Sequence, residues 1–227
     1  QNTIIGGLAG DALTDADYNI AIGYAALTMD TLGNRSVAIG YEALSTQNFT
    51  SATSTYNVAL GYNAGKVLTT GVQNTLLGGL AGDAITDGNN NIAIGKSALS
   101  ATQTGDQSVA VGSFALEYQA GNGAMNNTAV GYAAGNAITT GVQNTLIGGL
   151  AGDSLNTGQE NIALGYNALT LDTKGSHSVA IGSHALLQQN FSSATNSFNV
   201  AIGSSAGQQV TTGVKNTFLG GLAGDAT

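Results

Sequence analysis

Residues 19–23 read Asn-Ile-Ala-Ile-Gly, and this five-residue word decides the fold because it recurs along the whole chain. Its glycines follow one another at an almost constant spacing, with one longer step in each group of four. Such regular repetition predicts a solenoid in which each repeat forms one coil. Close variants of the word end at Gly6, Gly23, Gly40, Gly61, Gly78, Gly95, Gly112, Gly131, Gly148, Gly165, Gly182, Gly203 and Gly220.

Each coil begins with a short strand that ends at a glycine. The three apolar residues 20–22 are typical of a strand. The glycine that follows predicts a turn, or a place where two backbones approach closely. We therefore expect structural roles for Gly23, Gly40 and Gly95.

Two other positions of the coil are equally regular. An alanine stands three residues after each of the thirteen glycines, with Ala26 and Ala98 as examples, and a second short strand is expected around it. Four residues before the glycine stands Asn in ten coils, including Asn19 and Asn91, and Ser in three. Asn and Ser suit turns, and copies stacked in register can form a hydrogen-bonded ladder.

The first strand of each coil is apolar on both faces. Side chains alternate along a strand, so Ile20 and Ile22 point one way and Ala21 the other. Such a strand needs a cover on each face. The coil's own second strand is expected to cover one face, and another chain the other. Coils stack about 4.8 Å apart, which predicts a rod roughly 60 Å long with a thin core that also favours association.

The coils group into fours within a single repeat domain. Four-coil super-repeats span about 6–77, 78–147 and 148–219, and a partial repeat covers 220–227. The first strand of each group has a large middle residue, so every fourth layer is expected to pack differently. Neither end shows a capping coil, so we expect a fragment of a longer fibre.

Composition excludes several classes of partner. Only 8% of the 227 residues are charged and the net charge is −8, which disfavours nucleic acids and anionic membrane surfaces. The chain has no Cys, no apolar run long enough to cross a bilayer and no visible signal peptide.

The words at 19–23, 36–40 and 178–182 resemble the head repeats of YadA-like trimeric adhesins. Units with Tyr after the glycine, as at 23–27, resemble repeats of phage tail fibres that end in an intramolecular chaperone. The resemblance implies a left-handed parallel β-roll and a homotrimeric fibre. The repeats of that family are typically shorter than these coils.

The function expected from this resemblance is structural and adhesive, not enzymatic. The chain would be an extracellular segment of a surface adhesin or a phage tail fibre, and it would attach to a host glycan or protein receptor. Its expected partners are two further copies of itself and that receptor, without cofactor, nucleic acid or membrane insertion. The residues do not distinguish a bacterial adhesin from a phage fibre.

The third coil of each super-repeat carries an insertion, at 45–56, 117–126 and 187–198. An insertion in a solenoid must leave the stacked core, and aromatic residues beside small polar ones suit contact with carbohydrate or protein. A second possibility is that the rings fold back and cap the widened coil. The expected receptor-contact residues are Asn48, Phe49, Tyr56, Tyr118, Asn190, Phe191 and Phe198.

No pattern predicts a catalytic or metal site. Gly-Gly-Leu-Ala-Gly-Asp at 6–11 resembles calcium-binding nonapeptides, but its copies stand a whole super-repeat apart, so adjacent copies cannot complete a carboxylate cage. His177 and His184 are expected on the surface, and Asp11 and Asp30 in loops without a focal partner.

Other solenoid functions remain as alternatives. An ice- or crystal-binding solenoid needs a dense Thr ladder, whereas Thr pairs such as 69–70 recur only once in each super-repeat. A calcium-stabilised extracellular repeat protein is a further alternative. A polysaccharide lyase or hydrolase would need charged residues clustered on adjacent coils, and the chain has only five Lys and Arg.

Overall fold

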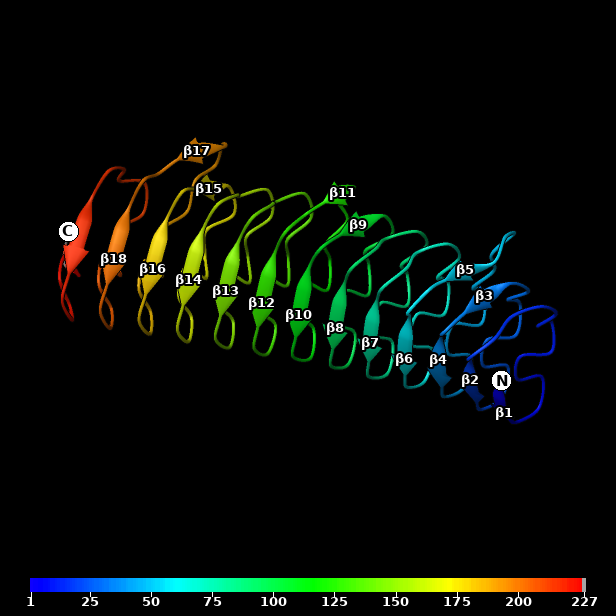
Figure 1. Ribbon diagram of the computed structural model, residues 1–227. Helices are drawn as coiled ribbons and strands as arrows, with labels where there is room; N and C mark the ends of the chain where they lie inside the picture. Colours follow the sequence, from blue (N-terminus) through cyan, green and yellow to red (C-terminus); the bar gives the residue numbers. More distant parts are fainter. Residues whose placement is uncertain (226–227) are drawn as a thin grey trace.

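The strand at the start of each coil joins one parallel sheet that runs the length of the molecule. The computed structural model describes residues 1–225, and in this range it contains strands and turns but no helix (Figure 1). The thirteen strands of the sheet lie in chain order. They are β1 (Thr3–Ile5), β2 (Ile20–Ile22), β4 (Val37–Ile39), β6 (Val58–Leu60), β7 (Thr75–Leu77), β8 (Ile92–Ile94), β10 (Val109–Val111), β12 (Thr128–Val130), β13 (Thr145–Ile147), β14 (Ile162–Leu164), β16 (Val179–Ile181), β18 (Val200–Ile202) and β19 (Thr217–Leu219).

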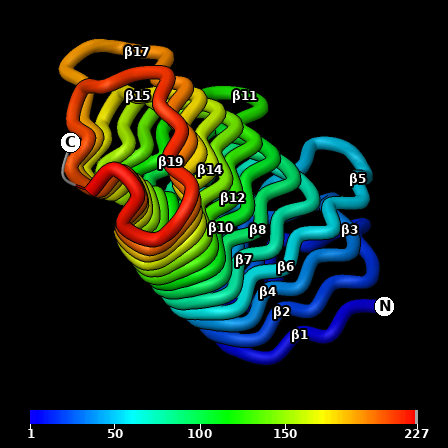
Figure 2. Tube along the Cα trace, turned by 90° about the vertical axis from the view of Figure 1, so that its left-hand side faces the viewer, coloured from blue at the N-terminus to red at the C-terminus, as the bar shows by residue number. Residues whose placement is uncertain are grey.

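Neighbouring strands pair without any shift of register. Ala21 pairs with Ala38, and Ala38 with Ala59, so equivalent residues form straight columns along the rod. This arrangement confirms the predicted all-β parallel solenoid of about 13 coils. Viewed toward its C-terminal end, the rod shows coils of similar outline stacked one behind another, with the strands of the long sheet aligned along one side (Figure 2).

The middle residue of each strand points into the coil and its two neighbours point outward. Ala21 is completely buried, whereas Ile20 and Ile22 are only half-buried. The coil interior therefore covers one face of the sheet, as expected, and within one chain the opposite apolar face is uncovered.

The glycine after each strand occupies a backbone conformation that other residues rarely adopt. Gly23, Gly40 and Gly95 have φ values of 129°, 140° and 131°. A Cβ atom on Gly23 would lie 2.5 Å from the carbonyl oxygen of Gly40 in the next coil. The column thus consists of glycine for both reasons, dihedral angle and space.

The second strand expected in each coil is absent between residues 1 and 225, because the backbone after the glycine is turn-like. Ala25 and Leu27 both have φ of 53°, on either side of the buried Ala26. Their amides still bond to neighbouring coils: Ala25 N donates to Gly7 O (2.9 Å) and Leu27 N to Ala43 O (3.0 Å). A hydrogen-bonded ladder therefore lines this corner without extended backbone.

The coil interior follows a rule of compensating sizes. A Cβ on Gly65 or on Gly82 would lie 2.7 Å from a methyl group of Leu76. Leu76, in the middle of β7, therefore fills the space beside both glycines. Where the strand residue is Ala93, the position equivalent to Gly82 holds the fully buried Leu99. This is how every fourth layer packs differently.

The predicted Asn ladder forms, mainly through side chain to backbone bonds. Asn91 Oδ1 accepts a hydrogen bond from Ser108 N (3.0 Å), and Asn91 Nδ2 donates to Gly105 O (2.8 Å). Asn19 bonds to Ser36 N and Gly33 O in the same way. Each Asn thus ties its own coil closed and holds the next coil in register.

The three insertions form excursions on one side of the rod (Figures 1 and 2). Each is anchored by a two-stranded parallel ladder to the return segment of the preceding coil. The ladders are β3 (Gly33–Asn34) with β5 (Thr53–Ser54), β9 (Gly105–Asp106) with β11 (Gly123–Ala124), and β15 (Gly175–Ser176) with β17 (Thr195–Asn196).

Candidate functional site

The outer face of the long sheet is an apolar stripe along the rod. It consists of the first and third residues of the thirteen strands, and we call it the sheet face. The third residue is Ile, Leu or Val in every strand, and the first is Ile, Val or Thr. Ile147 remains 38% exposed and Leu164 39% exposed. None of the residues of these thirteen strands carries a charge, so the carboxylate side chains all lie outside the long sheet.

Stacked tyrosines border the sheet face in the first super-repeat. Tyr24, Tyr41 and Tyr62 each follow the glycine of their coil, and their rings stack at 5.4 and 5.5 Å between centroids. The rings therefore pack between successive coils, and all three stay about half exposed. The Glu42 carboxylate raises the pKa of the Tyr41 phenol, and Glu42 also raises the pKa of Lys66, to which it is paired at 2.7 Å.

Each excursion rises from a buried polar cluster. Asp30 is fully buried. Its Oδ1 accepts hydrogen bonds from Gly33 N (2.9 Å) and Phe49 N (3.3 Å). Its Oδ2 accepts a hydrogen bond from Gln47 Nε2 (2.5 Å). Gln47 Oε1 in turn accepts from Asn57 Nδ2 (2.9 Å). Asp30 was expected in a loop without a partner for acid–base chemistry. Its burial and its hydrogen bond from Gln47 of the next coil were not predicted; Gln47 supplies a donor that the buried carboxylate needs.

The third super-repeat repeats this cluster and the second one varies it. Asp172 and Gln189 form the same bond at 2.6 Å, and Gly175 N donates to Asp172 Oδ1 (2.9 Å). In the second super-repeat Thr102 takes the place of the Asp and donates to Gln119 O (3.0 Å). The carboxylate therefore accompanies the two longer excursions.

Two of the seven expected contact residues are buried in the chain. Phe49 and Phe191 are only 6% and 5% exposed, so their rings cap the widened coil and are not available to a receptor. This corrects the expectation for these two residues. The physical reason is that the widened coil leaves space that an apolar ring fills at lower free energy than water does.

The other five expected contact residues are on the surface. Asn48 and Asn190 are exposed, and each side chain accepts a hydrogen bond from a Thr of the preceding coil. Tyr56, Tyr118 and Phe198 are about half exposed. They belong to three different excursions, so the chain does not gather them into one site.

Two further columns were missed in the sequence. The residue directly before the Asn or Ser that opens each coil has positive φ from the second coil onward. We call these residues the edge column, because they lie two residues before the first strand residue of the sheet face; Tyr18, Arg35 and Tyr56 occupy it in the first super-repeat. In the third super-repeat His177 stacks on Phe198 at 5.0 Å, and its Nδ1 lies 3.3 Å from Glu160 Oε2.

The other missed column lies eight residues after the glycine and is mostly Thr or Asn. Thr14, Thr69 and Thr86 each donate from the hydroxyl to a carbonyl oxygen of the next coil, at 3.0–3.1 Å. Thr is thus more frequent at equivalent positions than the Thr pairs suggested. The insertions make the distance between successive members of this column irregular, which obscured it in the sequence. The hydroxyl groups connect successive coils through these hydrogen bonds.

The calcium-like words end at corners of the coils, where Asp11 is exposed and Asp83 and Asp153 are half-buried. Burial raises the pKa of Asp83 and of Asp153, and Asp83 Oδ1 has no hydrogen-bond partner within residues 1–225. Over the same range, no three His, Asp or Glu side chains form a group that could hold a metal ion. The described residues also include no helix that could span a membrane.

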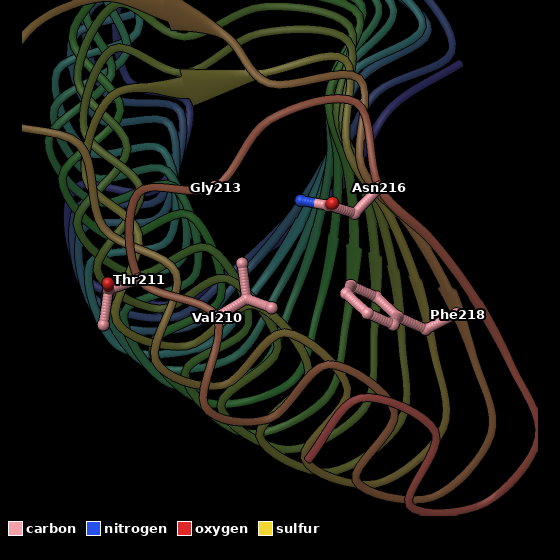
Figure 3. A pocket seen from close by; sticks show the side chains of 5 residues that line it. All are labelled: Val210, Thr211, Gly213, Asn216 and Phe218. Atoms are coloured by element: carbon pink, nitrogen blue, oxygen red, sulfur yellow. The ribbon is translucent and has the colours of Figure 1, made fainter. Parts of the chain in front are cut away.

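A cavity of about 330 Å³ lies at the C-terminal mouth of the stack (Figure 3). Val210, Asn216 and Phe218 line it. The equivalent interior residues, such as Leu68 and Leu76, are fully buried. The cavity is therefore the open end of the coil interior and carries no separate chemistry.

Searches against protein-family models, curated proteins and solved structures found no match.

Proposed function

We propose that this chain is a non-enzymatic segment of a homotrimeric fibre that attaches to a host surface. The observation that carries the proposal is the sheet face, an uncharged aliphatic stripe along the rod that one chain leaves half exposed. Contiguous exposed apolar surface of this extent marks an interaction site. The resemblance to YadA-like head repeats adds the expectation of three chains and left-handed coils.

The distribution of charge favours further copies of the chain as the partner. With a net charge of −8, copies repel one another wherever their carboxylates come close. Association through the sheet face keeps these carboxylates apart, because its columns contain only Ile, Leu, Val and Thr. The long straight register also lets every coil contribute a similar contact, so the apolar area grows with the number of coils.

Attachment is assigned to the excursions on one side of the rod. A fibre of three chains would display nine excursions, and display in several copies multiplies weak contacts without new chemistry. The half-exposed Tyr56, Tyr118 and Phe198 are the aromatic residues available there. The role is the same whether the segment belongs to an adhesin or to a tail fibre: the solenoid is a rigid extracellular support.

Assembly is tested by light scattering on the purified chain. The 22.5-kDa protein is expected to elute with the mass of a trimer, about three times this value. Ile147→Lys combined with Leu164→Lys places two charges on the sheet face and should yield monomers with an unchanged circular dichroism spectrum. Met29→Lys, at an exposed residue outside the sheet, is the control and should remain trimeric. A monomeric wild-type chain contradicts the proposed assembly.

Attachment is tested by shortening the longer excursions. Residues 45–56 and 187–198 are replaced by copies of 117–126, a natural excursion of the same solenoid. The trimer should persist, whereas binding to host cells or to a glycan array should fall. Unchanged binding would show that these excursions are not the attachment surface.

A further inference from the structure

The edge column of the first super-repeat holds a cation between two aromatic rings. The guanidinium carbon of Arg35 lies 5.2 Å from the centre of the Tyr18 ring and 5.9 Å from that of the Tyr56 ring. Such cation–π contacts hold a guanidinium in place without neutralising its charge. Tyr18 and Tyr56 are 52% and 53% exposed, so the group is open to solvent.

Arg35 is the chain's only arginine, and it has no carboxylate partner within residues 1–225. Its Nη1 donates to Ser54 Oγ at 2.6 Å, on the strand that begins the return from the first excursion. No other side-chain hydrogen bond of Arg35 occurs in the described part of the chain. In a protein with thirteen carboxylates, an immobilised guanidinium without an ion pair retains its charge and most of its donors for an external anion.

The fold holds this group firmly. Arg35 N donates to Asp17 O (3.1 Å), and Asn34 lies in β3, which pairs with β5 of the excursion. The carboxylate of Asp17, in the preceding coil, forms no ion pair with Arg35 within residues 1–225. The position of Arg35 is thus fixed by the solenoid on one side and by the excursion on the other.

We propose that Tyr18, Arg35 and Tyr56 form a binding site for a carboxylate-bearing saccharide, such as a uronic acid unit of a glycan. A planar guanidinium matches the two oxygens of a carboxylate, which gives the charge-assisted contact. The exposed phenol hydroxyls and Ser54 suit the sugar hydroxyl groups beside that carboxylate. This inference rests on the proposed attachment function, for which it specifies the ligand, but it does not require a trimer.

The other super-repeats carry different chemistry at the equivalent positions. The second has the neutral Asn90, Gln107 and Asn126, and the third has Glu160, His177 and Phe198. Because Glu160 lies beside His177, the third column is a poor place for a carboxylate. Lys215, which follows Phe198 in the same column, is a cation without a tyrosine beside it. Among residues 1–225, an arginine between two tyrosines therefore occurs at these positions in the first super-repeat alone, and the second super-repeat provides a neutral version.

The site is tested by isothermal titration with trigalacturonate and with its fully methyl-esterified form. Wild-type protein should bind the acid and lose on the order of tenfold in affinity for the ester, because the charge-assisted bonds disappear. Arg35→Gln should cause a similar loss. Lys174→Gln removes a cation near the foot of the third excursion, where Lys174 Nζ donates to Ser192 O, and should change nothing. Equal affinity for acid and ester, or an unaffected Arg35→Gln variant, overturns the proposal.

A gain of function tests the same site without loss of structure. Asn90→Tyr, Gln107→Arg and Asn126→Tyr together rebuild the group on the second super-repeat, and the stoichiometry should rise from one to two trisaccharides per chain. A stoichiometry that stays at one would show that these three side chains in this arrangement are not sufficient for binding. The titration is repeated on the Ile147→Lys, Leu164→Lys variant: if monomers still bind, the site stands even where the proposed trimer fails. If no form binds while the wild type is trimeric, the ligand assignment fails and the assembly stands.

Discussion

The Cβ atom that Gly78 lacks would lie 2.6 Å from the carbonyl oxygen of Gly95, one coil further along the rod. The φ of Gly78 is 137°, so an L-residue at this position is disfavoured by its backbone as well as by the lack of space. Gly79, the next residue, has nothing within 4 Å of its virtual Cβ. The fold therefore requires glycine at position 78, whereas position 79 has space for a side chain.

Gly78→Ala is expected to destabilise the fold by roughly 2–4 kcal/mol, from strained dihedral angles and from contact with the next coil. Gly79→Ala should be within about 0.5 kcal/mol of the wild type, as expected for surface changes. Thermal unfolding followed by circular dichroism measures both variants. Equal melting temperatures for the two would argue against close approach of successive coils.

Asn91→Ala should cost about 2–4 kcal/mol, because it removes the partners of two buried backbone groups, Ser108 N and Gly105 O. Asn90→Gly changes the exposed neighbouring residue. Glycine readily adopts the φ of 59° found at Asn90, so little change in the free energy of unfolding is expected. Chemical denaturation of the two variants makes the comparison. If Asn91→Ala unfolds at the wild-type denaturant concentration, the ladder contributes nothing to stability.

A volume swap tests how the coil interior is filled. Leu76→Ala should destabilise by about 2–5 kcal/mol through a cavity, and Gly82→Leu by about 1–3 kcal/mol through overpacking. Leu76→Ala, Gly82→Leu and Ile85→Thr together reproduce the interior of the next coil, which has Ala93, Leu99 and Thr102. Leu99 has φ of 53° and Gly82 of 56°, so the backbone already accepts leucine.

The triple variant should therefore be more stable than either of these single variants, which is a favourable coupling between neighbouring sites. Melting temperatures of the full set of single and combined variants give the coupling. Additive losses in the triple variant would contradict the compensation of sizes between Leu76 and Gly82.

Asp83→Asn combined with Asp153→Asn should stabilise the chain near pH 7 by less than about 1 kcal/mol, since both groups are only half-buried. Burial raises the pKa of both carboxyls above the usual 3.8, so the folded chain holds these protons more tightly than the unfolded chain. The stability of the wild type therefore falls as the pH rises from about 3.8 through the raised pKa values.

The advantage of the double Asn variant should accordingly vanish below pH 3.8, where both states of the wild type are protonated. Unfolding curves from pH 3 to 7 measure it, with Asp87→Asn in the exposed adjacent turn as control. A variant less stable than the wild type at pH 7 would mean that the ionised carboxylates have favourable partners.

The periodic word was sufficient to predict the solenoid, its register and the roles of Gly23 and Asn19. Each of these residues acts on its own copy in the next coil, so a repeat in the sequence is directly a contact in space. The second strand was predicted wrongly, because the corner around Ala26 forms its ladder with positive φ at Ala25 and Leu27. Alternation of apolar residues does not distinguish these two backbones.

The site was predictable only in part. The insertions are visible as longer spacings, and three aromatic residues in them are exposed. Phe49 and Phe191 were named as contact candidates, with capping of the widened coil as the other possibility, because the sequence does not give the volume of that coil; their burial agrees with capping. The contacts of Arg35 with Tyr18 and Tyr56 were not predicted, because this column changes residue type from coil to coil and so does not stand out as a repeat.

The sequence by itself determined the stacked coils, because identical residues at a constant period can satisfy one another only when they are placed in register. Only the tertiary structure decided which side chains fill each layer and which remain outside. Leu76 with Gly65 and Gly82 pairs different positions of the coil, whereas Asp30 with Gln47, and Arg35 with its two tyrosines, pair unlike residues at equivalent positions of successive coils. Their free energies depend on distances across the coil that no single repeat contains.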